Sequence, residues 1–423
     1  MSCSLPLSLT ENEHFRHFLS VVDSKYVPPA RNTITSRLTS LAAELQETIV
    51  KQLSSVNSVN TTLDIWSDRR MRAYLGVTCH YITTSAGAFA LRSSLLSCTR
   101  ISGSHTGERI ASEIESVFDT YGVKQKVDYI ITDNAANMRK AITVAFPQPT
   151  SEVEGDDEVH VDVDNPEMWE RMDDQDAQEV AHTSLTHAHK ERLSCLDHTL
   201  HLVVGDGLTE SRCISTSLAR CCKLASMLHT SSSFKDSFEN AFGPNTCISA
   251  AVSTRWNSTL RQIKSILALD AKTLTDLLEA KGLKHLTFST REWCQLREVV
   301  ELLDPFLEAT TLTEGDRVIT ISYALPSVLA LINHLQDVQS QLKYCGPMCF
   351  ALLASMKKRF EGMLQRVEVP VTRQVADISS LPFGSDIYII SAVLDPKFKL
   401  RWIDHEVKLT SSEKEELCQK VKG

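Results

Sequence analysis

The chain has 423 residues, 42% of them hydrophobic and 23% charged, a composition typical of globular proteins and a length sufficient for two or three domains. It contains no apolar run of about 18 residues, so no transmembrane helix is expected. The start, Met1 to Pro6, lacks a signal-peptide pattern and the twelve cysteines are scattered, so we expect reduced thiols in an intracellular protein.

The net charge of −9 conceals an uneven distribution. Residues 151–180 contain thirteen Asp or Glu and one Arg, a local balance of −12, which leaves +3 for the rest of the chain. The acidic overall balance therefore does not exclude nucleic-acid binding, and the mildly basic remainder does not argue strongly for it.

Residues 9–56 are predicted to be helical, with a break at Pro28-Pro29 because tandem prolines stop a helix. Apolar residues recur at helical spacing on both sides of this break. They are Phe15, Phe18, Leu19 and Val22 before it, and Leu38, Leu41, Leu45, Val50 and Leu53 after it.

Residues 60–147 change from helical to strand periodicity. Short apolar and β-branched runs predict strands at 63–66, 74–82 and 88–96, an amphipathic helix at 105–121, a fourth strand at 127–132 and a helix at 134–146. The order β-β-β-α-β-α is the opening of a ribonuclease H-like fold. In that fold the first and fourth strands are neighbours at the centre of the sheet.

Two aspartates occupy equivalent places in this pattern. Asp64 lies in Thr62-Leu63-Asp64-Ile65-Trp66, and Asp133 directly follows the predicted strand 127–132. Carboxylates on adjacent strand ends can converge on a hard cation such as Mg²⁺, and two are the minimum for a two-metal phosphoryl-transfer site. The alternative is that each Asp only caps the segment that follows it.

The rest of the chain divides into an acidic and a helical part. Residues 148–190 are polar, acidic and without periodicity, which predicts a disordered or loosely ordered loop. From residue 199 onward helical spacing continues almost to the end without a fixed repeat, which predicts an all-α domain rather than a repeat array.

Five short motifs follow one another along the chain. They are Thr62-Leu63-Asp64-Ile65-Trp66-Ser67, Thr132-Asp133-Asn134-Ala135-Ala136-Asn137-Met138, Cys195-Leu196-Asp197-His198-Thr199-Leu200-His201-Leu202, Ser253-Thr254-Arg255-Trp256-Asn257-Ser258 and Val393-Leu394-Asp395-Pro396-Lys397-Phe398-Lys399. Each alone is unspecific. In this order and spacing they resemble the hAT superfamily of DNA transposases, and most closely the transposase-derived zinc finger BED domain-containing proteins, over roughly residues 10–405.

The resemblance implies a ribonuclease H-like core with two aspartates and a glutamate binding Mg²⁺ or Mn²⁺. Asp64 matches the first aspartate and Asp133 the second. In the family a large helical domain interrupts the core before the glutamate, and residues 196–423 resemble that insertion.

The sequence departs from the family pattern in three respects. We find no Ser-Glu-Arg-like segment carrying the glutamate, no dimerisation region, and no Cys-x-x-Cys with a His pair before residue 10, where only Cys3 lies. We therefore expect a chain without the third catalytic carboxylate, without the BED finger and without enzymatic activity. Weak Mg²⁺ or Mn²⁺ binding at Asp64 and Asp133 is expected, and zinc is not.

Cys195 and His198 have three interpretations. Their spacing, with His201 nearby, fits part of a zinc site, but no partner pair is evident elsewhere in the sequence. In the family this motif is structural or lies near the DNA end, so we expect packing foremost, with a DNA-proximal role as the alternative.

Arg255 and Trp256 are the sharpest candidates for DNA binding. In the family the Trp of this pair lies near the active site and stacks on a flipped base, and Arg255 would contact phosphate. An aromatic platform suits that task because base stacking contributes about 1–3 kcal/mol. The equal alternative is that Trp256 anchors the start of a core helix. For Trp66, after the strand-end acid, packing is expected.

These inferences predict four segments: an N-terminal helical segment at 1–56, the ribonuclease H-like core at 57–147, the acidic insert at 148–190, and the end of a core strand plus the helical insertion at 191–423. The predicted function is a domesticated, non-transposing nuclear protein that associates weakly with DNA and regulates transcription. A fragment of an active Mg²⁺-dependent transposase and a protein-interaction scaffold, with protein rather than DNA partners, are the alternatives.

Overall fold

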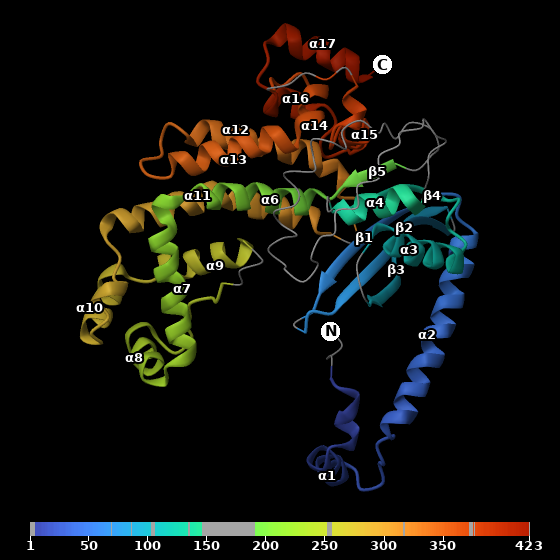
Figure 1. Ribbon diagram of the computed structural model, residues 1–423, viewed down its shortest axis with the longest axis horizontal. Helices are drawn as coiled ribbons and strands as arrows, with labels where there is room; N and C mark the ends of the chain where they lie inside the picture. Colours follow the sequence, from blue (N-terminus) through green and yellow to red (C-terminus); the bar gives the residue numbers. More distant parts are fainter. Residues whose placement is uncertain are drawn as a thin grey trace. The chain divides into compact units, whose positions relative to one another are not determined.

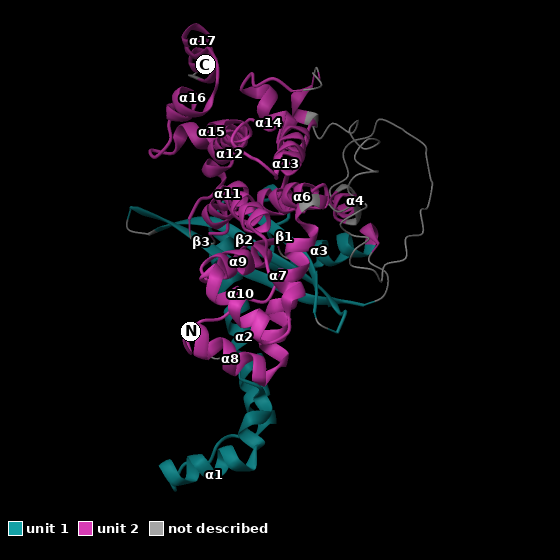
Figure 2. Cartoon of the chain, turned by 90° about the vertical axis from the view of Figure 1, so that its left-hand side faces the viewer, with its two compact units in different colours: residues 1–103, 109–129 teal, residues 104–108, 130–423 magenta. Residues whose placement is uncertain are grey.

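The computed structural model describes residues 5–68, 70–85, 87–102, 106–133, 136–145, 191–251, 256–315, 318–371, 375 and 377–422 (Figure 1). The chain forms two compact units, residues 1–103 with 109–129 and residues 104–108 with 130–423 (Figure 2). The predicted acidic loop at 148–190 lies outside the described residues. The predicted segment limits at 56, 147 and 190 stay predictions.

A five-stranded sheet has the order β3-β2-β1-β4-β5. Its strands are β1 (Val59–Ser67), β2 (Ala73–Ser85), β3 (Ala88–Ile101), β4 (Val127–Thr132) and β5 (Glu191–Ser194). The first and fourth strands are neighbours, as the sequence predicted. At the start of this pair, the Val59 amide donates to the Lys126 carbonyl at 2.8 Å. The expectation of a core strand ending just after residue 191 corresponds to β5.

The first three strands form an antiparallel meander, and buried side chains alternate along β1 and β2. Leu63, Leu75, Val77 and Cys79 are at most 3% exposed. With the helix α3 (Gly107–Tyr121), these side chains form the core of the first unit, and the Tyr121 hydroxyl ties the end of α3 to the Leu96 carbonyl at 2.9 Å. Burial of a Leu, Ile or Phe side chain contributes about 1.5–3 kcal/mol, so this alternation fixes which face each strand residue takes.

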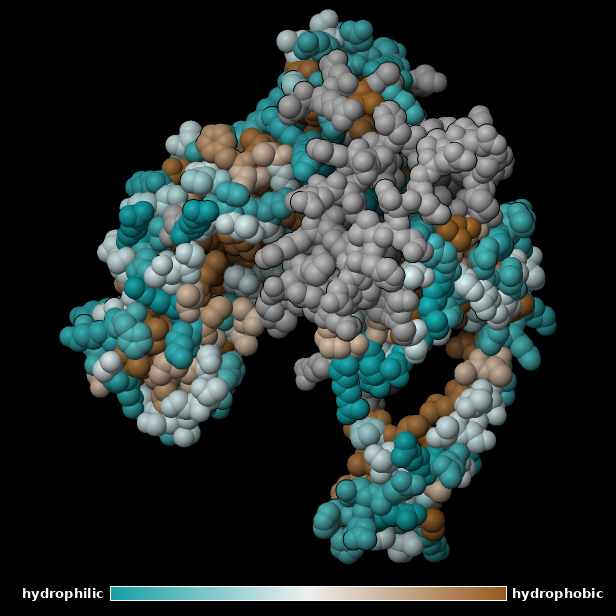
Figure 3. Space-filling view, viewed as in Figure 1, coloured by the Kyte–Doolittle hydropathy of each residue, from teal (hydrophilic) through white to brown (hydrophobic). Residues whose placement is uncertain are grey.

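The N-terminal helices form where predicted, with α1 at Glu13–Val22 and α2 at Arg31–Ser54, separated by the prolines. Their apolar faces are mostly not buried. In α2 only Ile49 and Leu53 are buried, whereas Leu38, Leu41 and Leu45 are 48–60% exposed. Figure 3 shows apolar residues along this helix. Periodicity thus identified the helix correctly, but the core of the unit covers only its last turns.

The second unit is mainly helical, as expected for the region after residue 199. Its described helices are α4 (Ala136–Ala145), α6 (Leu196–Thr209), α7 (Ser215–Thr230), α8 (Ser232–Phe242), α9 (Trp256–Leu267), α10 (Ala271–Ala280), α11 (Thr290–Thr313), α12 (Ala324–Val338), α13 (Gly346–Arg359), α14 (Glu361–Arg366), α15 (Ile387–Leu394), α16 (Arg401–Glu406) and α17 (Ser411–Lys422). None of the described helices is long and apolar enough to cross a membrane.

The long helix α11 organises its neighbours through buried polar groups. The Glu298 carboxylate accepts three backbone N–H groups, from Lys343, Tyr344 and Cys345, at 2.8–3.0 Å. These amides lie directly before α13, and the last of them belongs to Cys345, the N-cap residue of that helix, whose amide has no partner within the helix. A buried carboxylate here satisfies them and complements the positive end of the helix dipole.

A second polar contact compensates for Pro305 inside α11. Proline has no N–H, so the Glu301 carbonyl four residues earlier loses its helical donor. The imidazole Nε2 of His334, on α12, lies 2.9 Å from this carbonyl. Since a carbonyl can only accept, Nε2 carries the proton, and α12 supplies the hydrogen bond that α11 lacks.

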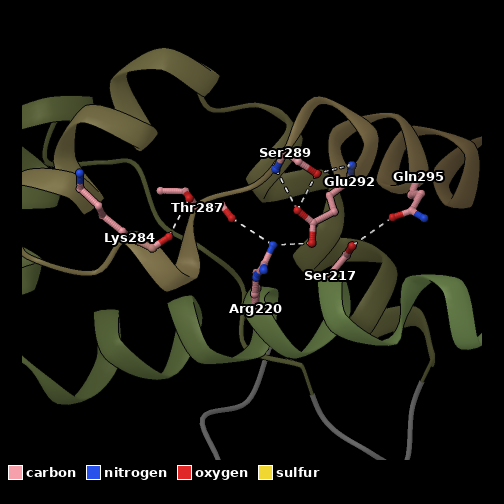
Figure 4. A network of polar contacts seen from close by, with 7 residues as sticks. All are labelled: Ser217, Arg220, Lys284, Thr287, Ser289, Glu292 and Gln295. Carbon is pink, nitrogen blue, oxygen red and sulfur yellow. Dashed lines mark hydrogen bonds and ion pairs between the residues drawn. The ribbon is translucent and has the colours of Figure 1, made fainter.

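Arg220 of α7 is held between α11 and the loop before it (Figure 4). Its guanidinium pairs with Glu292 and donates to the Thr287 carbonyl at 3.1 Å. Glu292 also completes a capping box with Ser289 at the start of α11. Burial alone would raise the pKa of Glu292, but the hydrogen bonds from Ser289 and the ion pair with Arg220 outweigh it, so the pKa lies below its ordinary value.

Candidate functional site

Asp64 lies on the open face of the β1–β2–β3 meander. Residues Val59, Thr61 and Leu63 of β1 are buried on the other face, and Asp64 is exposed. Asp64 stands opposite Gly76 of β2 and the next residue on the same face, Trp66, stands opposite Tyr74. The alternation that builds the core of the unit therefore presents the Asp64 carboxylate to solvent.

The indole of Trp66 lies across Gly76, beside Asp64. A Cβ atom added at Gly76 would meet the Trp66 ring at 2.8 Å, closer than real Cβ contacts. The Trp66 and Tyr74 rings are stacked, with centroids 6.0 Å apart and planes at 21°. Trp66 nevertheless remains 40% exposed. Trp66 therefore packs against Gly76 and Tyr74, as expected, while part of the residue stays exposed.

The turn between β1 and β2 is fixed by Asp68. Its carboxylate accepts the Arg70 and Arg72 amides at 2.9 and 3.0 Å and pairs with the Arg72 guanidinium, whose Nε lies 2.7 Å away. The pKa of Asp68 is lowered to about 2, mainly by the hydrogen bond from the Arg72 side chain and further by these amides. The Asp68 carboxylate is therefore ionised at neutral pH and able to keep these contacts.

Asp133 directly follows β4 and is half-buried. Its backbone is held from two sides: the Arg192 guanidinium and the Thr132 hydroxyl both donate to the Asp133 carbonyl, the latter at 2.8 Å. Arg192 Nε also donates to Thr132 Oγ1 at 2.8 Å. Sequence reasoning did not identify Arg192, because a single Arg at the edge of a disordered-looking segment carries no local signal.

Cys195 lies at the end of β5, next to the end of β4. Its amide donates to the Thr132 carbonyl at 2.8 Å, so the two strand ends lie side by side. Burial raises the pKa of the Cys195 thiol to about 11, and the nearby carboxylates of Asp197 and Asp133 add to the shift. The thiol is therefore protonated at neutral pH, a state typical of a packed cysteine rather than a nucleophile.

His198 follows in the first turn of α6 and is half-buried. Its neighbour Asp197 accepts a hydrogen bond from Thr313 Oγ1 at 2.5 Å, which links α6 to the end of α11. Burial raises the pKa of Asp197 above its ordinary value, and the Glu314 charge adds to this. Asp197 has the contacts of a packing residue. The packing and DNA-proximal interpretations of Cys195 and His198 stay open.

Trp256 begins α9 and is only 6% exposed. Helix α9 packs against α11, α7 and α6 within the second unit. Trp256 thus lies where the alternative interpretation placed it, buried at the start of a core helix. Its predicted base-stacking role stays a prediction, and it requires the ring to become accessible. Arg255 lies outside the described residues.

The predicted metal role of Asp64 and Asp133 also stays a prediction. Asp64 lies on β1, and Asp133 directly follows the neighbouring strand β4. Among the described residues no group of three or more His, Cys, Asp or Glu side chains is placed to share one ion. Two carboxylate oxygen donors suit Mg²⁺ or Mn²⁺ but supply only part of a coordination shell.

The sheet and the site residues define a class of fold, and comparison with known proteins supports it. The model of the ZBED1 RNase-like domain matches residues 62–148, a range that begins within β1, extends past the end of α4 and includes both aspartates. A mixed α/β arrangement with a five-stranded sheet fits a ribonuclease H-like core.

Three relatives extend the comparison beyond this domain. The putative transcriptional regulator tpeD of Talaromyces stipitatus is 21% identical over 94% of this chain and 43% of its own length. The putative AC transposase of Zea mays is 23% identical over 73% of this chain and 35% of its own length. The human zinc finger BED domain-containing protein 4 is 18% identical, over 93% of this chain and 29% of its own.

The chain therefore spans less than half of the length of each of these relatives. The family model and the relatives support a hAT transposase-derived protein, and the resemblance predicted from the five motifs is confirmed.

Proposed function

We propose that this chain acts in the nucleus as a DNA-associated regulator of transcription and does not itself transpose DNA. The transposase ancestry on which the proposal rests is supported by one observation: β1 and β4 are neighbours in the sheet, with Asp64 on the first and Asp133 directly after the second. The relative named a putative transcriptional regulator, similar over 94% of this chain, supports the regulatory part.

The proposed metal chemistry is limited to weak binding. Asp64 and Asp133 would hold Mg²⁺ or Mn²⁺, which in a complete site activates a nucleophile and stabilises a leaving oxygen. The 423 residues contain no segment that matches the family's glutamate motif. We therefore propose that this chain carries out no catalytic step of its own and that residues 196–423 correspond to the family's helical insertion.

Two assays test the proposal on the full chain. The first is filter binding of a labelled duplex at increasing salt. The affinity is expected to fall steeply, because neutralising DNA phosphates releases counterions. Absence of binding at low salt would favour the protein-interaction scaffold over any DNA role.

The second assay is DNA cleavage and strand transfer with Mg²⁺ or Mn²⁺. We expect no products from the chain. Products that disappear in both Asp64→Ala and Asp133→Ala would contradict the proposal and revive the second candidate, a fragment of an active transposase. That candidate is favoured by one fact, that the chain covers less than half of each transposase it resembles.

A further inference from the structure

The first unit contains a row of three side chains across the open face of its sheet. Trp66 of β1 stands opposite Tyr74 of β2, and Tyr74 stands opposite Arg100 of β3. Residues directly opposite in an antiparallel pair project to the same face, about 4.5–5.5 Å apart between Cβ atoms. The adjacent row on this face consists of Asp64, Gly76 and Cys98.

We propose that Trp66, Tyr74 and Arg100 form a binding site for an unpaired nucleotide, with the base stacked on Trp66 and its phosphate at Arg100. This site rests on the proposed DNA association and names the form of DNA that the face takes. It lies wholly within the first unit, and it would lead a single strand past Asp64.

The exposure and support of the indole carry this proposal. A side chain that only packed would be expected to bury both ring faces, as the 6–7% exposed Trp256 and Trp293 do. Trp66 instead is 40% exposed and has one side supported by Gly76 and Tyr74. Supported aromatic rings with a free face are the stacking platforms of proteins that bind single strands.

The charge of the row favours nucleic acid over an apolar partner. Arg100 is exposed at the end of the row opposite Trp66, and a guanidinium suits a phosphate because its N–H groups match the oxygens. Thr62, Thr78 and His80 on the same face of β1 and β2 are polar, and Thr62 Oγ1 lies 3.2 Å from His80 Nε2. Leu95 of β3, opposite Thr78, is apolar and 59% exposed. The cationic end of the row at Arg100 is therefore the feature that favours a nucleotide over a purely apolar partner.

The test is the affinity of the full chain for a labelled oligo-dT of about 16 nucleotides. Trp66→Ala is expected to weaken binding by about tenfold or more, and Trp66→Phe by much less, since a ring remains. Gly76→Ala keeps the indole but displaces it, and is expected to weaken binding in the same direction. Phe89→Ala is the matched control, because Phe89 is 79% exposed on β3 outside the row.

Arg100→Ala is expected to reduce the slope of log affinity against log salt by about 0.7, the contribution of one phosphate contact on a single strand. Arg92→Ala is its control, since Arg92 is exposed on β3 but opposite Tyr81, on the other face. Tryptophan fluorescence adds an independent measurement: quenching by oligo-dT is expected to shrink in Trp66→Phe.

Two results would overturn the inference in distinguishable ways. If the wild-type chain binds oligo-dT and the Trp66, Gly76 and Arg100 variants bind as well as Phe89→Ala and Arg92→Ala do, the site is wrong while DNA association stands. If the wild-type chain binds neither oligo-dT nor duplex at low salt, the proposed function itself fails.

Discussion

Two tryptophans from the motifs of this chain lie in opposite environments. Trp66, at the end of a strand in the first unit, is 40% exposed beside Asp64, whereas Trp256, at the start of a helix in the second, is 6% exposed. The motif pattern gave Trp256 two equal interpretations, base stacking and core anchoring, and predicted packing for Trp66. The difference teaches that the role of a motif aromatic depends on which of its faces the fold leaves open.

Among the substitutions that test this comparison, Trp256→Ala is expected to change the free energy of unfolding most. Removing a buried indole leaves a cavity among α9, α11 and α7, so the free energy of unfolding should fall by about 3–5 kcal/mol. Trp66→Ala should cost about 1 kcal/mol, because the ring is only partly buried. Urea titration measures both. Equal losses of unfolding free energy in the two variants would contradict the distinction between Trp256 as a core residue and Trp66 as a partly exposed one.

Glu298→Ala is expected to have the next largest effect, about 3 kcal/mol. The substitution leaves the Lys343, Tyr344 and Cys345 amides without the carboxylate that they share, at a buried helix start. Glu301→Ala, at an exposed position on the same helix, is the control and should change stability by less than about 0.5 kcal/mol. If Glu298→Ala lowered the free energy of unfolding no more than Glu301→Ala does, the contacts of Glu298 before α13 would be unimportant for stability.

The smallest effect concerns Glu292 and the pH dependence of the helical unit. The pKa of Glu292 is lowered in the folded state, so its contribution to stability is complete above the ordinary value of 4.5 and is lost as pH falls through the folded pKa. Glu292→Gln should remove about 1 kcal/mol at neutral pH and flatten the acid limb. Urea titrations at several pH values between neutral and acid measure this.

Glu279→Gln is the matched control for that experiment, because the Glu279–Lys284 pair spans 3.8 Å between exposed side chains. It should leave both stability and the acid limb nearly unchanged. An acid limb that is identical in the wild type and in Glu292→Gln would contradict the role assigned to the Arg220–Glu292 contact.

Much of the fold followed from local signals. Alternation and turn residues located the strands, although β1 begins at Val59 rather than at residue 63 and β3 extends to Ile101. Periodicity also located α2, but it could not say that Leu38, Leu41 and Leu45 would stay exposed. A stripe of leucines indicates a helix with an apolar face and carries no information about what covers that face.

The candidate site was less predictable because its contacts join distant residues. Arg192 reaches the Asp133 carbonyl across 59 positions of sequence. The row of Trp66, Tyr74 and Arg100 depends on the register of two hairpins, which a bulge at Val77 and Thr78 shifts by one residue. One signal was available: residues 64 and 66 are two apart in a strand and share a face.

The most direct test of the account is a titration of the chain with Mn²⁺, followed by the loss of free-ion signal in electron paramagnetic resonance. If Asp64 and Asp133 share one ion, the wild-type chain binds Mn²⁺ weakly and both Asp64→Asn and Asp133→Asn lose that binding. Wild-type affinity in either single variant would show that the two carboxylates do not form one metal site, and would contradict the proposed metal role of this pair.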